Sequence, residues 1–322
     1  MKAVVFTKYG LPDVLQLKEV DKPVPKENEV LVKVHAASIN SWDWELLRGT
    51  PFVNRLVFGI LKPKKINILG CDIAGNVEAV GKRVKQFQVG DKVFGDLSRC
   101  GWGGFAEYLC APEDALALKP ASMSYEQAAS IPQAALLALQ GLVDKGHVRH
   151  GQKVLINGAG GGAGTFAIQI AKLYGAEVTA VDSTSKLEMM RSLGADHVID
   201  YTQENYTKNG QTYDLILDFS AYHSFFDYKR ALNSKGTFLM VGGSSGLANK
   251  FLFLGTFVSM TSSKKMGLLL HKSNKGLSKV IELVEDGKVK PVIDRCYPLS
   301  ETADAFRYFA KGNVQGKLVI SN

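Results

Sequence analysis

The chain has 322 residues and a net charge of +8 at pH 7, from 39 Lys and Arg against 31 Asp and Glu. Hydrophobic residues make up 46% of it and charged residues 22%, which is typical of a folded globular protein and excludes an intrinsically disordered one. The basic residues are scattered, so we expect no nucleic-acid interface. No apolar run is long enough for a transmembrane helix, so no such segment is predicted.

The four cysteines, at positions 71, 100, 110 and 296, form no CxxC pair. This spacing argues against a disulfide framework and against a structural zinc lobe. A reducing compartment, the cytoplasm, is the simplest expectation. The positive charge suits an anionic cofactor, although a solvated basic surface would explain it as well.

Residues 1 to about 120 are rich in short alternating runs that Gly and Pro interrupt, which predicts a barrel-like β domain with little helix. The predicted strands are Lys2–Thr7, Val30–Ile39, Ile73–Val80, Lys92–Gly95 and Gly104–Cys110.

From about Tyr125 the pattern changes to alternating strands and helices, and its clearest unit is Lys153–Asp182. An apolar strand, a glycine turn, an amphipathic helix and a second strand that ends in an acid follow one another there. Phosphate oxygens can approach main-chain N–H groups at a helix start only where no Cβ blocks them, which glycines ensure. An acid at the tip of the second strand can accept a hydrogen bond from a ribose hydroxyl.

This order of elements indicates a dinucleotide site, and an ordinary glycine-rich turn is the alternative. The residues that we expect to bind the cofactor here are Gly158, Gly161, Gly162, Ala163, Gly164 and Asp182.

Further strands are predicted at Asp196–Asp200, Leu215–Phe219, Gly236–Val241 and Lys264–Leu270, and helices at Lys186–Leu193, Phe225–Leu232 and Leu277–Glu285. Such alternation predicts a parallel, doubly wound sheet with its ligand at the carboxyl ends of the strands. Gly242 and Gly243 lie at one of these ends and are expected to allow the cofactor close to the main chain. The tail, with a predicted helix to Ala310 and a strand at Gly316–Ile320, returns to the character of the first domain.

Several motifs in this order resemble the medium-chain dehydrogenase/reductase superfamily. They are GCDIAGNVEAVG at 70–81, VGDKVFG at 89–95, GGFAEYL at 103–109, the glycine loop, RSLGADHVIDY at 191–201 and GKLVI at 316–320. The resemblance implies an α/β protein with a GroES-like β-barrel catalytic domain, residues 1–122 plus 297–322. It implies a Rossmann dinucleotide-binding domain at residues 123–296.

Within that superfamily the chain is most similar to the zinc-lacking quinone oxidoreductases and enone (alkenal) reductases. Zinc alcohol dehydrogenases need a Cys, a His-Glu pair and a second Cys at three places that read here Ser38–Ser41, Cys71–Asp72 and Gln133–Ala135. One thiol without neighbouring ligands does not hold zinc, so no metal is expected. Without it, hydride addition to a conjugated C=C bond is the easier reaction.

The resemblance therefore implies an NAD(P)H-dependent oxidoreductase that reduces α,β-unsaturated carbonyls or quinones. A zinc-type alcohol dehydrogenase and a dinucleotide-binding protein with vestigial activity remain alternatives. Asn40 is expected near nicotinamide and substrate, with a turn Asn as the alternative; Asp43 is expected to orient a neighbour or relay a proton, or simply to begin a helix. The group's usual Tyr is missing from LLRGTPF (46–52), which leaves the proton donor open.

Cofactor preference is divided between two sets of residues. Asp182 favours an unphosphorylated ribose, because a 2′-phosphate would meet like charge. In NADPH-using members of the group, a Lys and a Tyr at the separation of Lys186 and Tyr201 hold the phosphate. We therefore expect NADPH slightly ahead of NADH, with help from Ser183, Thr184 and Lys317.

Two apolar segments point to contacts outside the fold. Lys264–Leu270 matches the edge strand through which the superfamily dimerises, so a homodimer is expected. Phe251–Phe257 is unusually apolar and could line a substrate channel, touch a membrane surface or pack in an interface.

Overall fold

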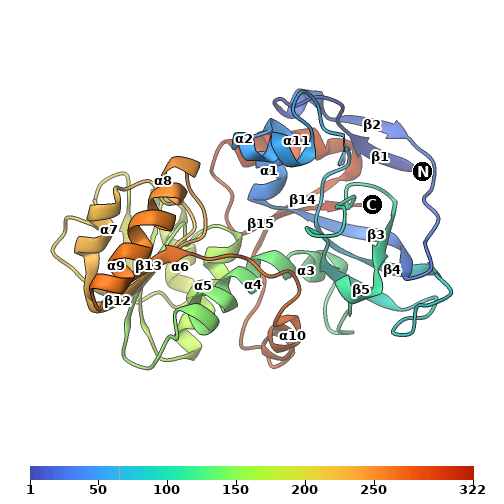
Figure 1. Cartoon of the computed structure of the whole chain (residues 1–322). Helices are drawn as coiled ribbons and strands as arrows, with labels where there is room; N and C mark the ends of the chain where they lie inside the picture. Colours follow the sequence, from blue (N-terminus) through green and yellow to red (C-terminus); the bar gives the residue numbers. More distant parts are fainter. Residues whose placement is uncertain (65) are drawn as a thin grey trace. The chain divides into compact units, whose positions relative to one another are not determined.

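The computed structural model describes residues 1–64 and 66–322. They form two compact units (Figure 1). Unit 1 comprises Met1–Gln133, Ser273–Leu277 and Pro291–Asn322, and unit 2 comprises Ala134–Lys272 and Ser278–Lys290. The domain boundaries 122/123 and 296/297 stay predictions.

Unit 1 is built on a largely antiparallel sheet. Among the described residues this sheet has seven strands, in the order β14-β15-β3-β4-β5-β7, with β6 paired to β3. Alternating apolar residues of β3 and β4 face a core that includes Phe6, Val32, Ile73 and Phe306. The strands are β3 (Glu29–Ile39), β4 (Asp72–Val80), β5 (Lys92–Asp96), β6 (Tyr108–Pro112), β7 (Ala117–Leu118), β14 (Ile293–Pro298) and β15 (Lys317–Ser321), with β1 (Lys2–Val5) and β2 (Gln16–Glu19) as a separate pair.

Unit 1 also contains two helices between residues 41 and 58, where the sequence predicts a helix only as the alternative role of Asp43. The Asp43 carboxylate accepts a 2.8 Å hydrogen bond from the N–H of Asn40, which starts the first helix, and Gly49 ends it with a φ of +61°. The helices are α1 (Ser41–Arg48), α2 (Phe52–Phe58), α3 (Tyr125–Ala129) and α11 (Thr302–Ala310), with single 3₁₀ turns at Pro12–Val14, Glu113–Ala115 and Leu299–Glu301.

Unit 2 contains the predicted parallel sheet. Its strands are β8 (Lys153–Asn157), β9 (Glu177–Asp182), β10 (His197–Asp200), β11 (Tyr213–Asp218), β12 (Leu232–Met240) and β13 (Lys265–Leu268). In the described part of the chain their order is β10-β9-β8-β11-β12-β13. The chain moves outward to one side from β8 and to the other from β11, so the strand order reverses between these two neighbours. In a doubly wound sheet this reversal is where ligands bind.

Helices cover this sheet (Figure 1). Gly158–Gly164 lies directly after β8, so the glycine loop is at the point of reversal. The helices are α4 (Pro132–Leu139), α5 (Gly162–Leu173), α6 (Leu187–Ser192), α7 (Phe225–Ala231), α8 (Ser245–Lys250), α9 (Thr256–Thr261) and α10 (Leu277–Glu285), with helical turns at Gln140–Lys145, Thr184–Lys186 and Phe251–Gly255.

Candidate active site

The loop between β8 and α5 has little room for side chains. Gly158 has a φ of +74°, and a Cβ on Gly164 would lie 2.3 Å from the Gly158 carbonyl oxygen. A Cβ on Gly161 would meet only that oxygen, at 3.4 Å, and otherwise open space. The loop therefore presents bare main chain beside the first N–H groups of α5, which have no acceptor inside the helix.

The predicted acid and lysine lie together on this loop. Asp182 and Lys186 are each 7% exposed, and the Lys186 ammonium is 3.1 Å from a carboxylate oxygen of Asp182. The same carboxylate accepts hydrogen bonds from the N–H groups of Gly160 (2.9 Å) and Ser183 (2.8 Å). A Cβ on Gly160 would come within 2.5 Å of Lys186 Cδ, so the lysine stem packs against Gly160 and leaves Gly161 open.

Other predicted cofactor residues flank this pair or follow the next strands. The Tyr201 N–H donates to the Asp182 carbonyl over 3.2 Å, its side chain is 46% exposed, and the Thr184 hydroxyl donates to Asp200. Gly242 and Gly243 follow β12. A Cβ on Gly242 would lie 2.2 Å from the carbonyl oxygen of Phe219, which follows β11.

A dinucleotide fits the chemistry of this part of unit 2. Bare main chain at a helix N-terminus suits a pyrophosphate, and the Asp182–Lys186 pair offers both an acceptor and a cation at the tip of the next strand. Gly162 and Ala163 are the first two residues of α5, so their N–H groups lie among the available donors.

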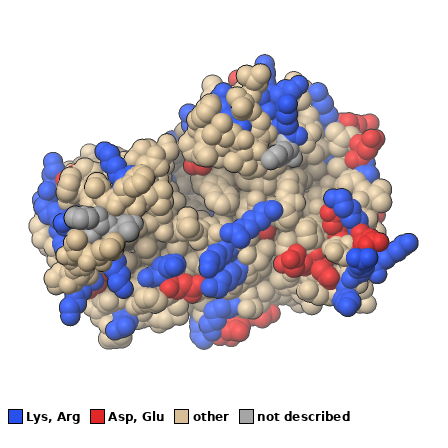
Figure 2. Space-filling model, viewed as in Figure 1, with Lys and Arg blue, Asp and Glu red and all other residues tan. Residues whose placement is uncertain are grey.

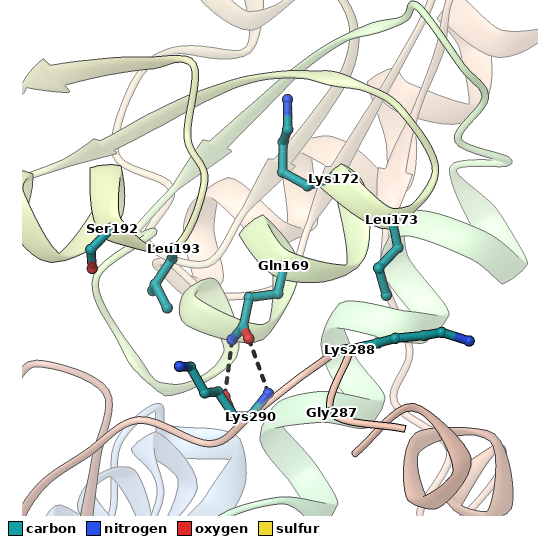
Figure 3. Close-up of a pocket in the computed structure, with 8 residues that line it drawn as sticks. All are labelled: Gln169, Lys172, Leu173, Ser192, Leu193, Gly287, Lys288 and Lys290. Carbon is teal, nitrogen blue, oxygen red and sulfur yellow. Dashed lines mark hydrogen bonds between the residues drawn. The ribbon is translucent and has the colours of Figure 1, made fainter. Parts of the chain in front are cut away.

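A separate pocket in unit 2 lies away from the glycine loop (Figure 3). The Gln169 side chain exchanges two 3.0 Å hydrogen bonds with the main chain of Lys290 at its wall. None of the predicted cofactor residues lines this pocket. Its lining residues are Gln169, Lys172, Leu173, Ser192, Leu193, Gly287, Lys288 and Lys290.

In unit 1, polar residues from four neighbouring strands meet at one edge of the sheet. Lys317 begins β15, Asn40 follows β3, Asp72 begins β4 and Asp96 ends β5. Strand register explains the meeting, because Leu318 pairs with Ile39, Ser38 with Asp72, and Asp72 with Asp96. We call this group, with Cys71 and Gln133, the buried polar cluster.

Asn40 lies at the centre of the buried polar cluster and is 6% exposed. Its amide oxygen accepts a hydrogen bond from the Lys317 ammonium, which also donates to the Ile39 carbonyl over 3.2 Å. Its amide nitrogen donates to Asp72 over 3.1 Å and lies 3.4 Å from the Cys71 sulfur. Because an ammonium can only donate, Lys317 fixes which way the amide points.

The remaining contacts hold the cluster to the main chain. Asp72 accepts from the Gln133 N–H over 3.2 Å, and the Gln133 side-chain amide lies 3.7 Å from the Cys71 sulfur. Asp43, fully buried beside it, accepts from the N–H groups of Asn40 (2.8 Å) and Gly70 (2.7 Å). The two carboxylates are thus fixed by backbone donors.

Burial dominates the electrostatics of the cluster. It raises the pKa of Asp72 to about 8, against the Lys317 ammonium 3.8 Å away, and it lowers the pKa of Lys317. Burial likewise raises the pKa of Asp43 to about 7, which its two backbone donors oppose. It raises the pKa of the Cys71 thiol well above the ordinary value, so this group is protonated at neutral pH.

The cluster offers three potential metal ligands, since atoms of Cys71, Asp72 and Asp96 lie within 4.8 Å of one another. The residues fit a structural or catalytic zinc poorly. Zinc is bound by thiolates, imidazoles and carboxylates, but this set contains no imidazole, and a fixed cation, the Lys317 ammonium, lies 3.8 Å from Asp72. Lys317, predicted as a cofactor ligand, donates instead to Asn40 within unit 1 in this structure.

The sequence does not predict Asp96 as a site residue. It indicates Asp72 and Gln133 only as the residues that replace zinc ligands. The available signal was that each polar residue borders a predicted strand. That pattern does not predict which strands pair with each other or in which register they pair.

These two sites define a class of protein, a dinucleotide-dependent oxidoreductase with a GroES-like first half. Residues 26–121 match the family model described as alcohol dehydrogenase GroES-like domain, and residues 193–320 the one described as zinc-binding dehydrogenase. The chain is 33% identical to the chloroplast envelope quinone oxidoreductase homolog of Arabidopsis thaliana, over 99% of this chain and 98% of that protein.

Two further similar proteins are also oxidoreductases by name. An NADPH-dependent alkenal/one oxidoreductase, chloroplastic, of Arabidopsis thaliana is 34% identical over 99% of this chain and 79% of its own length. The structure of the quinone oxidoreductase from Coxiella burnetii superposes with a TM-score of 0.89 at 32% identity, covering 100% of this chain and 99% of that one. The chain belongs to the medium-chain dehydrogenase/reductase superfamily, in its quinone oxidoreductase group.

The expected superfamily and fold class are therefore confirmed, and a nicotinamide cofactor is supported. Within residues 1–64 and 66–322, no helix has both the length and the hydrophobicity needed to cross a bilayer. In the apolar segment Phe251–Phe257, Phe251 is buried and Leu252–Leu254 are exposed, while the side chains at 256 and 257 lie outside the described part.

Proposed function

We propose that this protein uses NAD(P)H to reduce the C=C bond of α,β-unsaturated carbonyls or quinones, without zinc. The observation that carries the proposal is the ammonium of Lys317, which lies beside Asn40 and Asp72 in the buried polar cluster, where a metal-dependent relative would need its ligands. The names of the relatives, a quinone oxidoreductase and an alkenal/one oxidoreductase, support the substrate class.

The glycine loop and the Asp182–Lys186 pair bind and orient the cofactor in this proposal. When bound, the reduced nicotinamide supplies the hydride. Gly158–Gly164 holds the pyrophosphate, and Lys186, with Ser183, Thr184 and Tyr201 nearby, meets a 2′-phosphate. Asp182 restrains Lys186 and accepts from a ribose when the phosphate is absent. This arrangement supports NADPH slightly ahead of NADH.

Asn40 stabilises the substrate oxygen as negative charge develops on it. Its amide nitrogen has two hydrogens: one is donated to Asp72 over 3.1 Å, and the other meets only the Cys71 sulfur, which is a poor acceptor. An oxyanion accepts that N–H far better. Lys317 acts as a positioning residue that holds the amide in this orientation, and Asp43 holds the main chain of Asn40. The proton that completes the reduction comes from solvent or through Asp43.

The test measures NADPH and NADH oxidation by purified protein with short and long enones, enals and quinones. We expect turnover with conjugated substrates and none with simple ketones. Asn40→Ala should lower kcat about 100-fold, the effect of removing one oxyanion donor. Asn54→Ala, at a half-buried position of α2 in the same unit, is the matched control and should change little. Equal rates with and without conjugated substrates would remove the proposal.

A zinc-type alcohol dehydrogenase is the second candidate, because one matching family model carries the description zinc-binding dehydrogenase. Elemental analysis decides between the two. One zinc per chain, together with alcohol oxidation that a chelator abolishes, would favour the alternative over our proposal.

We also propose a homodimer that pairs β13, which is an edge strand of the described sheet in unit 2. Analytical ultracentrifugation of the wild type and of Met266→Pro tests it. The cytoplasmic location stays a prediction, and the names of some relatives specify the chloroplast.

A further inference from the structure

Helix α2 presents its apolar residues outward. None of its residues is buried, whereas a surface helix ordinarily packs one apolar stripe against the core. Within α2 the exposed apolar side chains recur at four-residue spacing and share one side, and two further exposed apolar residues follow Gly59, where the helix ends. They are Phe52 (62% exposed), Val53 (55%), Leu56 (59%), Val57 (48%), Ile60 (57%) and Leu61 (90%). We call them the α2 apolar face.

The polar side of the same helix is tied to the domain. The Asn54 amide donates to the Thr50 carbonyl over 2.9 Å, and the Arg55 guanidinium donates to the Gly49 carbonyl over 3.1 Å. That guanidinium also lies 4.9 Å from the centre of the Tyr9 ring. The Tyr9 hydroxyl donates to the Gly59 carbonyl over 2.8 Å. These contacts hold α2 with its polar side inward, so the outward apolar face is a fixed feature.

The segment that carries this face is basic. Between Glu45 and Asp72 the sequence contains Arg48, Arg55, Lys62, Lys64 and Lys65 and no acidic residue. Lys62 and Lys64 are exposed and, among the described residues, have no ion-pair partner. In Figure 2 the surface at the position of α2 is mostly tan, with blue side chains close by.

We propose that the α2 apolar face docks on an anionic lipid surface. Apolar side chains flanked by Lys and Arg are what a helix lying in the headgroup region requires, since the side chains enter the acyl boundary and the cations meet lipid phosphates. A second copy fits less well, because two-fold pairing would bring like-charged basic residues against each other. This surface is independent of the proposed reaction.

The test is vesicle co-sedimentation of the full-length protein. The wild type should bind vesicles of phosphatidylcholine that contain about 30% phosphatidylserine. Its binding to vesicles of phosphatidylcholine alone should be at least about tenfold weaker. High salt should release it. Leu56→Ser with Leu61→Ser should weaken binding at least about tenfold, and Lys62→Glu with Lys64→Glu should remove the preference for phosphatidylserine.

Val24→Ser with Val89→Ser is the matched control, because these side chains of unit 1 are 83% and 64% exposed. It should bind as the wild type does, and all variants should keep the wild-type Tm. Three results would overturn the proposal: no binding of the wild type to anionic vesicles, equal loss in the control, or conversion of a dimer to a monomer by the Leu56 and Leu61 changes. The last would assign the face to a second copy.

Discussion

Each unit of this protein buries a lysine against an aspartate, but the two pairs arise in different ways. In unit 2, Lys186 and Asp182 are four residues apart and 3.1 Å from each other, beside a loop that the same segment supplies. In unit 1, Lys317 and Asp72 come from opposite ends of the chain, lie 3.8 Å apart and share their surroundings with Asn40 and Asp96. The first pair is local, and the second exists only because strands β15, β3, β4 and β5 are neighbours.

This difference between the two pairs predicts different effects of mutation at the two sites. The local pair sits on a loop whose main chain is ready for an anion, so its loss should affect ligand binding more than folding. The long-range pair is fully enclosed, and removing one partner leaves buried polar groups without their hydrogen-bond partner, which should affect folding directly.

Lys317→Met should lower the free energy of unfolding by about 3 kcal/mol, because the buried Asn40 amide oxygen and the Asp72 carboxyl group lose the ammonium that they face. Urea denaturation measures this change. Lys317→Met with Asp72→Asn should recover most of the loss, and Lys311→Met, at an exposed position of unit 1, should change it by less than about 0.5 kcal/mol. A single variant as stable as the wild type would contradict the contrast.

Gly161→Ala should leave the fold intact, since its Cβ meets only the Gly158 oxygen, at 3.4 Å. It should nevertheless weaken NADPH binding about 30-fold, because a methyl group in the path of the pyrophosphate costs about 2 kcal/mol of charge-assisted hydrogen bonding. Calorimetry measures the Kd. Gly267→Ala, which also places its Cβ in open space, is the control. Unchanged NADPH affinity in the first variant would place the cofactor elsewhere.

Lys186→Ala should lower kcat/KM for NADPH about tenfold, the effect of one lost charge-assisted contact, and change the value for NADH little. Asp182→Ala should act in the opposite direction and raise the NADPH-to-NADH ratio a few-fold. Lys172→Ala, which breaks a 2.7 Å ion pair with Asp196 elsewhere in unit 2, is the control. Steady-state kinetics with both cofactors measure these ratios, and equal losses for both would exclude a phosphate-binding role.

The pKa of Asp43 should make the free energy of unfolding depend on pH. Burial raises its pKa to about 7 in the folded protein, so the folded state holds this proton more tightly than the unfolded chain does. The free energy of unfolding should therefore fall as pH rises from about 4 to about 7, by at most about 1.4 kcal/mol per unit for one proton.

Asp43→Asn removes this titration, so between pH 6 and 7 its stability should fall about 1 kcal/mol less than that of the wild type. The raised pKa of Asp72 also lowers the free energy of unfolding as pH rises. Because Asp72 is present in both proteins, its contribution cancels when the two are compared. Urea denaturation at several pH values gives the two curves. Parallel curves would show that Asp43 is ionised in the folded protein throughout this range.

The order and spacing of residues in the sequence predict the fold class and most of the proposed cofactor site. Glycines 158 to 164 and Asp182 follow one another in a short segment, and the spacing of apolar residues locates the strands on either side. The βαβ unit is local, so its geometry follows from the order of its residues. The same patterns indicate α1 only as an alternative and do not predict α2; the ends of α1 depend on the Asp43 cap and on Gly49.

The buried polar cluster and the outward orientation of the α2 apolar face depend on tertiary contacts and could not be predicted from the sequence. Strand neighbours and register bring Lys317 to Asn40, and no local pattern encodes that pairing. The apolar residues of α2 suggest burial when they are read as a sequence. Contacts of Asn54 and Arg55 with main-chain carbonyls before the helix, and of Arg55 with the Tyr9 ring, turn the apolar residues to the surface instead.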